Sequence, residues 1–315
     1  MASCILHIGT HKTGTTTLQN AFASGAEWLD AAGLYYPAAG RIYGGHHHLV
    51  PEMLGLPHAG DQGGSLAGLL AEIAGKPDRI SIVSSERLHA LAARPAALRA
   101  LAKALASHGI ATRVVLYVRE RPSYLESLYA QLLKHGLRST FREFVEAVAL
   151  DGRFEFDDIR LYDVKYARIA DAFSEAFGAS TIAVRPYAFD TTPDAIVRDF
   201  LGVTGFGHAS VPDSIERANV TLSFREIARR WLGNLPHGAA APERLEAVAR
   251  GLFGDRADAV LDGPFRVFDE DEAAALTARF AEDDRALERT YGVRLPAPHR
   301  PRGLGAMRLF DALMR

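Results

Sequence analysis

The fold is decided by residues 4–33, which read CILHIGTHKTGTTTLQNAFASGAEWLDAAG. Residues 4–9 form a short apolar run that ends in glycine, which is typical of a buried strand in a parallel sheet. A polar loop, THKTG, follows, and then Leu18, Phe22 and Leu29 recur at helical spacing up to a final glycine. The stretch therefore predicts a strand, a loop and a helix in succession.

The same alternation continues along the chain. Apolar runs predict further buried strands at 80–84, 112–119 and 181–187. Residues 34–64, rich in Gly, His, Tyr and Pro, are expected to form an irregular excursion over the sheet edge. Helices are expected at 65–74 and 95–108, from Pro122 onward, and at 141–150, 162–177, 193–201, 221–232, 243–253 and 270–290, with a short amphipathic piece at 305–314.

This order of elements predicts an α/β fold with a doubly wound parallel sheet and right-handed crossovers. No segment has the composition of a domain boundary, so we expect one domain over residues 1–315. Within it, residues 1–204 are expected to form the sheet core and residues 205–315 a mainly helical C-terminal part. Ligands of such sheets bind beyond the carboxyl ends of the strands.

Composition excludes several classes of protein. Of the 315 residues, 48% are hydrophobic and 23% are charged, which is ordinary globular usage and excludes a disordered chain. No apolar run approaches the ~20 residues of a membrane-spanning helix. A net charge of −2 argues against a nucleic-acid partner, because such binding needs many phosphate neutralisations. Cys4 is the only cysteine, and residues 1–14 lack the basic and long apolar regions of a signal peptide, so we expect a cytoplasmic protein without disulfides.

The first loop has the chemistry of an anion site. Gly9 and Gly14 have the spacing of a P-loop, G-x-x-x-x-G-K-[ST], but Thr15 follows the second glycine and the lysine is displaced to Lys12. Backbone N–H groups at a helix start bind phosphate or sulfate, and threonine hydroxyls add donors. The alternative interpretation is a turn that only caps the helix. The residues expected to contact the anion are His11, Lys12, Thr13, Gly14, Thr15, Thr16 and Thr17.

The segment HKTGTTTLQ resembles the 5′-phosphosulfate-binding loop of the sulfotransferases that use 3′-phosphoadenosine 5′-phosphosulfate (PAPS). The resemblance implies a P-loop-like α/β domain, PAPS as donor, 3′,5′-diphosphoadenosine (PAP) as product and no requirement for a metal. It also implies that Lys12 stabilises the charge that develops on the leaving phosphate, as is typical of in-line group transfer.

A second segment, VVLYVRERPSYLESLYAQ, resembles the part of these enzymes that binds the 3′-phosphate. It has Arg119 at the end of a predicted strand and Ser127 eight positions later on the next helix. Arg119 can chelate a phosphate through two N–H groups, and the Ser127 hydroxyl can donate to the same group. The family's Arg-Lys-Gly loop is absent from SIERANVTLS at 214–223, where Arg217 is a candidate substitute, while HRPRGLG at 299–305 is a second candidate lid.

Sulfuryl transfer to a hydroxyl needs a base for the acceptor proton. Glu86 is the first candidate, because it directly follows the predicted strand 80–84. Some family members use a glutamate, which supports it, although a carboxylate paired with Arg87 or capping a helix is the alternative. The rival is the run His46, His47 and His48, of which His47 and His48 are the preferred candidates, since a neutral imidazole also serves as a base.

The leading hypothesis is therefore a PAPS-dependent sulfotransferase acting on a carbohydrate or small-molecule hydroxyl. The aromatic and histidine side chains of the 34–64 segment could stack on and hydrogen-bond a sugar or, equally, a phenol; they are Tyr35, Tyr36, Tyr43 and His46–His48. A P-loop kinase-like phosphotransferase is the first alternative, but a strand that ends in Arg119 lacks the carboxylate that holds Mg²⁺ there. The second alternative is a nucleotide-binding module without catalytic activity.

Overall fold

A computed structural model describes residues 1–56, 65–187, 192, 194–212, 215, 222–235, 242–297 and 307–313 of the protein. The chain divides into two compact units, each built from separated segments. Unit 1 comprises residues 1–119, 155–218 and 283–295, and unit 2 comprises residues 120–154, 219–282 and 296–315. That the chain functions as a single domain stays a prediction.

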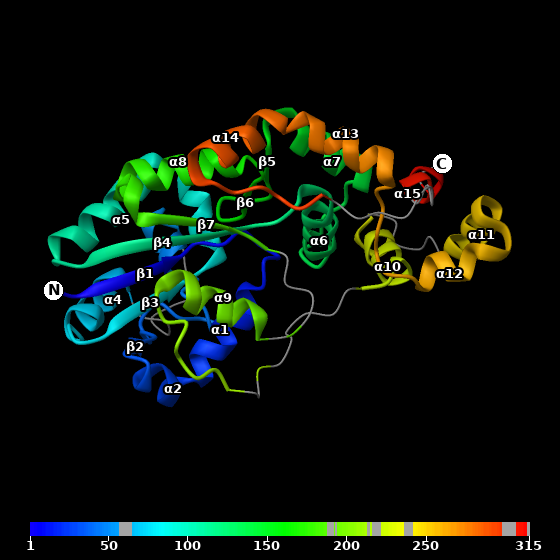
Figure 1. The fold of residues 1–315 in the computed structure, drawn as a ribbon. Coiled ribbons are helices and arrows are strands. Elements are labelled where there is room, and N and C mark those ends of the chain that lie inside the picture. The colour runs from blue at the N-terminus through cyan, green and yellow to red at the C-terminus, as the bar shows by residue number, and fades with distance from the viewer. Residues whose placement is uncertain are drawn as a thin grey trace. The chain divides into compact units, whose positions relative to one another are not determined.

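Unit 1 is built on a parallel sheet of five strands in the order β2-β3-β1-β4-β7 (Figure 1). The register places Leu6 opposite Val83 on one side and Val114 on the other. The predicted α/β class with a central parallel sheet is therefore confirmed. The strands are β1 (Ser3–His7), β2 (Leu34–Tyr35), β3 (Ile80–Ser84), β4 (Ala111–Val118) and β7 (Ile182–Pro186).

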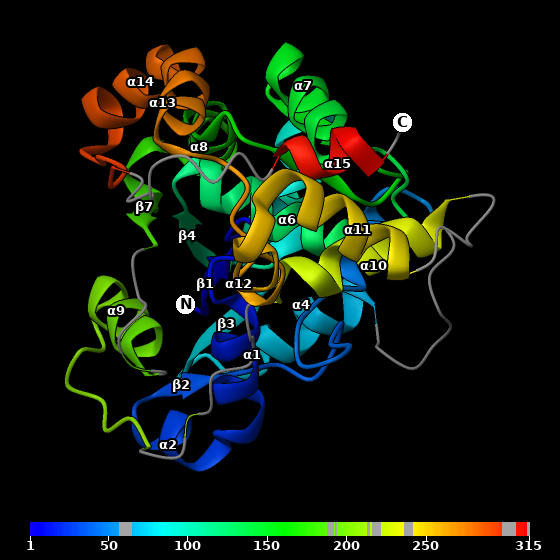
Figure 2. The ribbon, with the colours of Figure 1, turned by 90° about the vertical axis from the view of Figure 1, so that its right-hand side faces the viewer.

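Successive residues of each strand enter different cores, because side chains alternate between the two faces of a sheet. Leu6 and Leu116 pack with α3, α4, α5 and α8, whereas Ile5 and Val115 pack with α1, α2 and α9. Figures 1 and 2 show α8 on one side of the sheet and α1, α2 and α9 on the other. The helices of this unit are α1 (Thr15–Ser24), α2 (Ala26–Ala31), α3 (Leu49–Met53), α4 (Leu66–Ala74), α5 (Pro95–Ser107), α8 (Tyr166–Phe177) and α9 (Ala195–Thr204), with 3-10 turns η2 (Glu86–Ala93) and η3 (Ala179–Thr181) and the short strand β6 (Leu161–Asp163).

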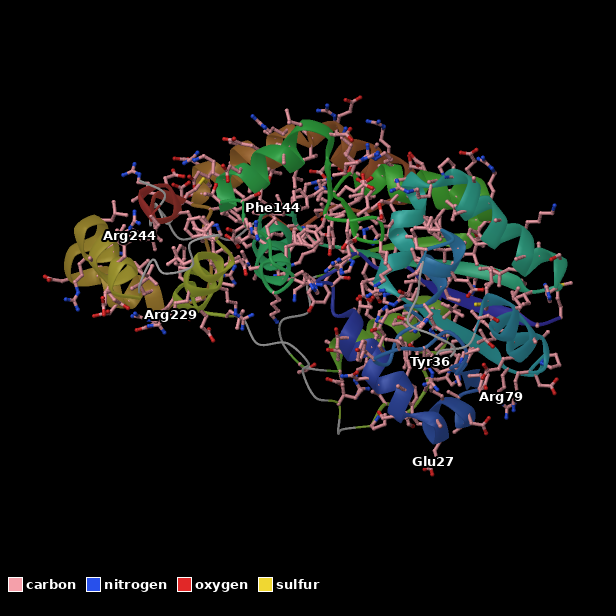
Figure 3. The ribbon with its side chains drawn as sticks, turned by 180° about the vertical axis from the view of Figure 1, so that it is seen from behind. Glu27, Tyr36, Arg79, Phe144, Arg229 and Arg244 are labelled. Carbon is pink, nitrogen blue, oxygen red and sulfur yellow. The ribbon has the colours of Figure 1, made fainter. Side chains whose placement is uncertain are left out.

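Unit 2 is helical and has a core of aromatic side chains. The Tyr129 ring packs against the rings of Phe141, Phe144 and Phe310, and Figure 3 shows Phe144 amid other side chains. Its elements are α6 (Arg121–Leu133), α7 (Phe141–Asp151), α10 (Phe224–Asn234), α11 (Pro242–Phe253), η4 (Gly254–Arg256), α12 (Ala257–Asp262), α13 (Glu270–Arg279) and α15 (Met307–Leu313), while β5 (Arg153–Glu155) and α14 (Ala281–Tyr291) run from one unit into the other.

Several predicted boundaries were wrong for local reasons. The first helix breaks at Gly25, where a Cβ atom would lie 1.9 Å from the Trp28 indole nitrogen. The segment 34–64 is not wholly irregular, since it supplies the edge strand β2 and the helix α3. Residues 162–163 are strand rather than helix, and the helix expected over 270–290 divides at Phe280 into α13 and α14. Within the described residues, no helix is both long and apolar enough to cross a membrane.

Candidate active site

The loop between β1 and α1 is anchored along β4. Ile8 N donates to the Val115 carbonyl at 3.0 Å, and Thr10 donates to the Tyr117 carbonyl through both its N–H (3.0 Å) and its hydroxyl (3.1 Å). Gly9 has no room for a side chain, because a Cβ atom would lie 2.7 Å from His7 Nε2. The loop is therefore held in one path at the carboxyl end of the sheet.

Left-handed backbone shapes the rest of the loop. Lys12 (φ 64°) and Gly14 (φ 75°) both have positive φ, which is rarely adopted by a non-glycine residue and costs conformational energy at Lys12. The Thr13 hydroxyl donates to the Thr10 carbonyl at 2.5 Å, so its hydrogen is engaged within the loop. At Gly14 a Cβ atom would lie 3.0 Å from the Tyr187 ring. Such tight packing turns the chain sharply into α1.

The start of α1 is suited to an anion. Gly14 occupies the N-cap position and no side chain caps the helix, so its first N–H groups have no side-chain acceptor. Thr15 is buried, and its hydroxyl has no hydrogen-bond partner among the described residues. Buried polar atoms are usually paired, so an unpaired hydroxyl at a helix N-terminus fits a bound phosphate or sulfate. Thr16 is exposed and Thr17 is buried in the same turn.

Arg119 lies against this loop. It directly follows β4, and its Nη1 donates to the Lys12 carbonyl at 3.3 Å. Its guanidinium lies over the Tyr187 ring, 5.7 Å from the centroid, and the Tyr166 hydroxyl donates to its carbonyl at 2.8 Å. The structure thus brings the lysine and the arginine that the sequence singled out to one edge of one sheet.

A second group of polar side chains surrounds Glu86, the first residue of η2. Gln19 of α1 donates from Nε2 to Glu86 Oε2 at 3.1 Å. His47 Nδ1 lies 3.8 Å from Glu86 Oε2, and His11 Nδ1 lies 4.0 Å from Glu86 Oε1. Ser85 caps η2 by accepting from Arg87 N, and its hydroxyl also lies 2.9 Å from His47 Nδ1. Two of the candidate bases, Glu86 and His47, therefore belong to one cluster, which we call the Glu86 cluster (Gln19, Glu86, His11 and His47).

Electrostatics leave this cluster with one negative charge at neutral pH. Burial lowers the pKa of His11 to about 3 and also lowers that of His47, so both imidazoles are neutral. Burial alone would raise the pKa of Glu86, but it is outweighed by His47 and His11, which are cationic at the low pH where Glu86 titrates, by a backbone N–H and by the Gln19 amide, so that the pKa falls to about 2. A fifth of the Glu86 side chain is exposed, against 8% for each histidine. The ionised carboxylate is thus the most accessible group of the cluster.

The other two histidines of the run have different surroundings. His46 is buried; its Nδ1 accepts from Ser84 N at 3.1 Å and its Nε2 faces the Pro37 carbonyl at 3.2 Å, which fixes the ring to the end of β3. Burial lowers its pKa to about 3. His48 is buried at the N-cap of α3. A catalytic role for His48 stays a prediction.

The remaining predicted donor-site residues are Ser127, Arg217 and His11. Ser127 is half-buried on α6, in unit 2. Arg217 and the segment 299–305 lie outside the described residues. His11 faces Glu86 and lies edge-on to the rings of His89 and Tyr162, so it belongs to the Glu86 cluster; its predicted contact with the donor stays a prediction.

Sequence reasoning missed Gln19, Ser84 and Ser85. Ser84 lies between buried groups, since its hydroxyl is 2.8 Å from His7 Nδ1 and 3.4 Å from Gln19 Nε2. A signal for Gln19 was present in its position, four residues after Thr15 on the same helix face.

A cleft of about 250 Å³ opens on the outer side of α1. It begins beside the predicted anion site, because Thr17 lies on its wall. Trp28 and Ile215 give it apolar walls, and hydroxyl and amide groups give it polar ones. The lining residues are Thr17, Asn20, Ala21, Ser24, Gly25, Trp28, Pro212 and Ile215. In the described part of the chain, no group of three or more His, Cys, Asp or Glu side chains is arranged to hold a metal ion.

Comparison with known proteins gives a fold and no closer relationship. No protein-family model matches the chain, and no curated protein matches it. Among solved structures, it is similar to a sulfotransferase from Alicyclobacillus acidocaldarius, with a TM-score of 0.50 and 16% identity over 96% of this chain and 98% of that chain. At this identity the match shows a shared fold.

Proposed function

We propose that the protein transfers a sulfuryl group from PAPS to an acceptor hydroxyl. The observation that carries this proposal is the uncapped start of α1, with its unpaired Thr15 hydroxyl and with Arg119 bonded to the Lys12 carbonyl. On one ligand, a dianionic end group would satisfy the start of α1 with the Thr15 hydroxyl, and a second phosphate would satisfy Arg119. The solved sulfotransferase of the same fold adds support at the level of architecture.

The donor would bind along the carboxyl edge of the sheet in unit 1. The 5′-phosphosulfate would accept hydrogen bonds from the first N–H groups of α1 and from the Thr15 hydroxyl. Arg119 would pair with the 3′-phosphate through its guanidinium, which the Tyr187 ring supports. The cleft beside α1 would take the adenine, with Trp28 and Ile215 against the faces of the purine.

The chemical step is an in-line displacement at sulfur. The acceptor oxygen forms a bond to sulfur as the bond from sulfur to the bridging phosphate oxygen breaks. Lys12 would stabilise the negative charge that develops on that bridging oxygen. The acceptor proton would pass to Glu86, and PAP would leave with the electron pair of the broken bond.

We assign the base to Glu86 rather than to His47, because its carboxylate is ionised and partly exposed. With a pKa of about 2 it is a weak base in the donor-free protein. A bound donor adds several negative charges nearby, and like charges raise the pKa of a carboxylate. Donor binding would therefore strengthen the base before the acceptor reacts. The acceptor would be a carbohydrate or small-molecule hydroxyl, and a cytoplasmic location stays a prediction.

Ligand-induced stabilisation tests the donor assignment directly. A ligand that binds only the native state at 100 times its Kd stabilises by about 2.7 kcal/mol, which raises Tm measurably. We expect PAP to raise Tm and ATP with Mg²⁺ to have little effect. Transfer from ³⁵S-labelled PAPS to a panel of hydroxyl acceptors would follow. A larger shift with ATP and Mg²⁺ would support the kinase alternative, and PAP binding without transfer to any acceptor would support the non-catalytic one.

A further inference from the structure

A tight turn at residues 42–45 holds a tyrosine in a strained backbone conformation. Ile42 N donates to the Gly45 carbonyl at 2.7 Å, and Gly45 N donates back to the Ile42 carbonyl at 3.0 Å. The two central residues, Tyr43 (φ 51°) and Gly44 (φ 87°), both have positive φ, as a two-residue hairpin turn of the mirror-image type requires. Among the described residues, Lys12 is the only other non-glycine residue with positive φ.

Burial of the Tyr43 side chain does not offset the cost of this strained backbone conformation. A left-handed conformation costs an L-residue about 1–2 kcal/mol, and Asn, Asp or Gly is the usual choice at such a position. Burial could offset that cost, but 93% of Tyr43 is exposed. Strain that the fold does not need is characteristic of functional positions.

The turn is hydrogen-bonded to the fold and packs closely against the Glu86 cluster. The Tyr36 hydroxyl donates to the Gly44 carbonyl at 2.7 Å, and Figure 3 shows Tyr36 within the fold. At Gly45 a Cβ atom would lie 2.6 Å from both Gln19 Nε2 and His47 Nε2, so the backbone of the turn lies directly against the cluster. The same Gln19 nitrogen donates to Glu86. One amide group therefore separates the turn from the proposed base.

We propose that Tyr43 is an acceptor-binding residue that receives a flat face of the substrate beside Glu86. This inference rests on the proposed function, because it supplies the acceptor side of the same site. An exposed tyrosine ring carried on a hydrogen-bonded turn suits the C–H face of a pyranose or the π face of a phenol, and its hydroxyl adds a hydrogen bond. The acceptor class is thus a hydroxyl carried on a ring with such a face.

The test separates a binding role from a structural one by the sign of the stability change. Tyr43→Asn and Tyr43→Gly suit positive φ, so we expect Tm to stay constant or rise by about 2 °C. The KM for the acceptor should rise about 10-fold, with the KM for PAPS and the Tm shift by PAP unchanged. Tyr43→Phe should keep KM within about 3-fold. Leu150→Asn, at an exposed apolar residue of α7, is the matched control and should change neither the KM for the acceptor nor the KM for PAPS.

The probes are two ring panels, simple glycosides such as octyl β-glucoside and phenols such as 2-naphthol, each with labelled PAPS. The panel that the wild-type protein sulfates faster supplies the acceptor for the variants. An unchanged acceptor KM in Tyr43→Gly would overturn the inference, as would sulfation confined to acceptors without a ring, or binding of PAP with no sulfation of either panel. Failure of the wild-type protein to bind PAP would instead overturn the proposed function itself.

Discussion

The proposed donor loop (residues 8–15) and the Glu86 cluster lie in the same unit but are built in different ways. The loop is a continuous segment whose chemistry comes from backbone N–H groups, a hydroxyl and Lys12. The cluster is assembled from η2, α1, the first loop and the 42–48 segment, and its chemistry comes from side chains that meet only in the fold. A contiguous site can be found in a sequence, whereas a composite site depends on topology.

The electrostatics of the two regions differ as well. The loop and Arg119 present positive charge and helix N–H groups, which favour an anion. The Glu86 cluster has neutral imidazoles around one carboxylate. One region would therefore hold charge that is already present on the donor, and the other would remove a proton from the acceptor. Variants that separate these two tasks are the sharpest tests.

Lys12→Ala should have the largest effect. Loss of one preorganised charge at a reacting oxygen costs a factor of about 10²–10³ in kcat, and we expect the upper end because the bridging oxygen takes the full charge. The Kd for PAP should change much less, since N–H groups and Arg119 remain. Lys103→Ala, an exposed lysine of α5, is the matched control. An unchanged kcat at saturating PAPS together with weaker PAP binding would show that Lys12 acts in binding alone.

Glu86→Gln tests the other region and should lower kcat by about 10²-fold, as loss of a general base does. PAP should raise Tm as in the wild-type protein, because the donor site is intact. Glu27→Gln is the matched control, since Figure 3 shows Glu27 projecting into solvent. Full activity in Glu86→Gln together with inactivity in His47→Gln would transfer the assignment to the imidazole.

The histidines around the cluster should make the fold sensitive to acid. The buried side chains of His7, His11 and His46 have pKa values of about 4, 3 and 3, whereas unfolded histidine protonates near pH 6.5. Between these values the unfolded state binds more protons, so stability falls as pH drops below 6.5. Glu86, with its pKa lowered, adds to the loss only below its ordinary pKa of 4.5.

Each such imidazole should cost about 2 kcal/mol of unfolding free energy between pH 7 and pH 5. Urea titrations at pH 5, 6 and 7 measure how steeply the free energy of unfolding falls with decreasing pH. His46→Gln keeps an acceptor for Ser84 N and a donor for the Pro37 carbonyl without titrating, so it should flatten the slope by one imidazole's share. A stability that rises between pH 7 and pH 5 would contradict the neutral state of these rings.

Arg119→Ala should act on the nucleotide rather than on the chemistry. Loss of a charge-assisted pair with a phosphate should weaken PAP binding about 10-fold, which is about 1.4 kcal/mol, while kcat at saturating PAPS changes less. Arg79→Ala, at the surface residue labelled in Figure 3, is the control. A fall in kcat with unchanged PAP affinity would place Arg119 on the reacting group.

The sequence predicted the elements that have strong local patterns. The strand at 80–84 was predicted to the residue, and the helices at 66–74, 95–107 and 141–151 within one residue at each end, because apolar runs and capping residues mark them. It missed β2, since two residues are too short for alternation to show, and it missed the break at Gly25, where the Trp28 ring leaves no room for a side chain. Local signals reveal elements, but not how neighbouring side chains interrupt them.

The candidate site divides along the same line. Lys12 and Arg119 were singled out from the sequence and lie together in the structure. Glu86 and the run His46–His48 were weighed as rivals, because nothing in the sequence brings that run to the end of β3; the pairing of His46 with Ser84 does so. Gln19 was quoted within a motif, yet its role depends on the distance to Glu86, which no spacing along the chain reveals.

Gln19→Met should have the smallest effect, and it tests whether the two regions are linked. Gln19 joins α1, the helix of the proposed donor site, to the carboxylate, and its hydrogen bond lowers the pKa of Glu86. Methionine preserves length but cannot donate, so the acid limb of kcat should move to higher pH by about half a unit and kcat should fall about 3-fold to 10-fold. Ala23→Met, at an exposed position of α1, should change neither the acid limb of kcat nor the value of kcat. A lower kcat with an unmoved acid limb would mean that Gln19 only packs, whereas a shifted limb with unchanged PAP affinity would show that the donor helix sets the strength of the base.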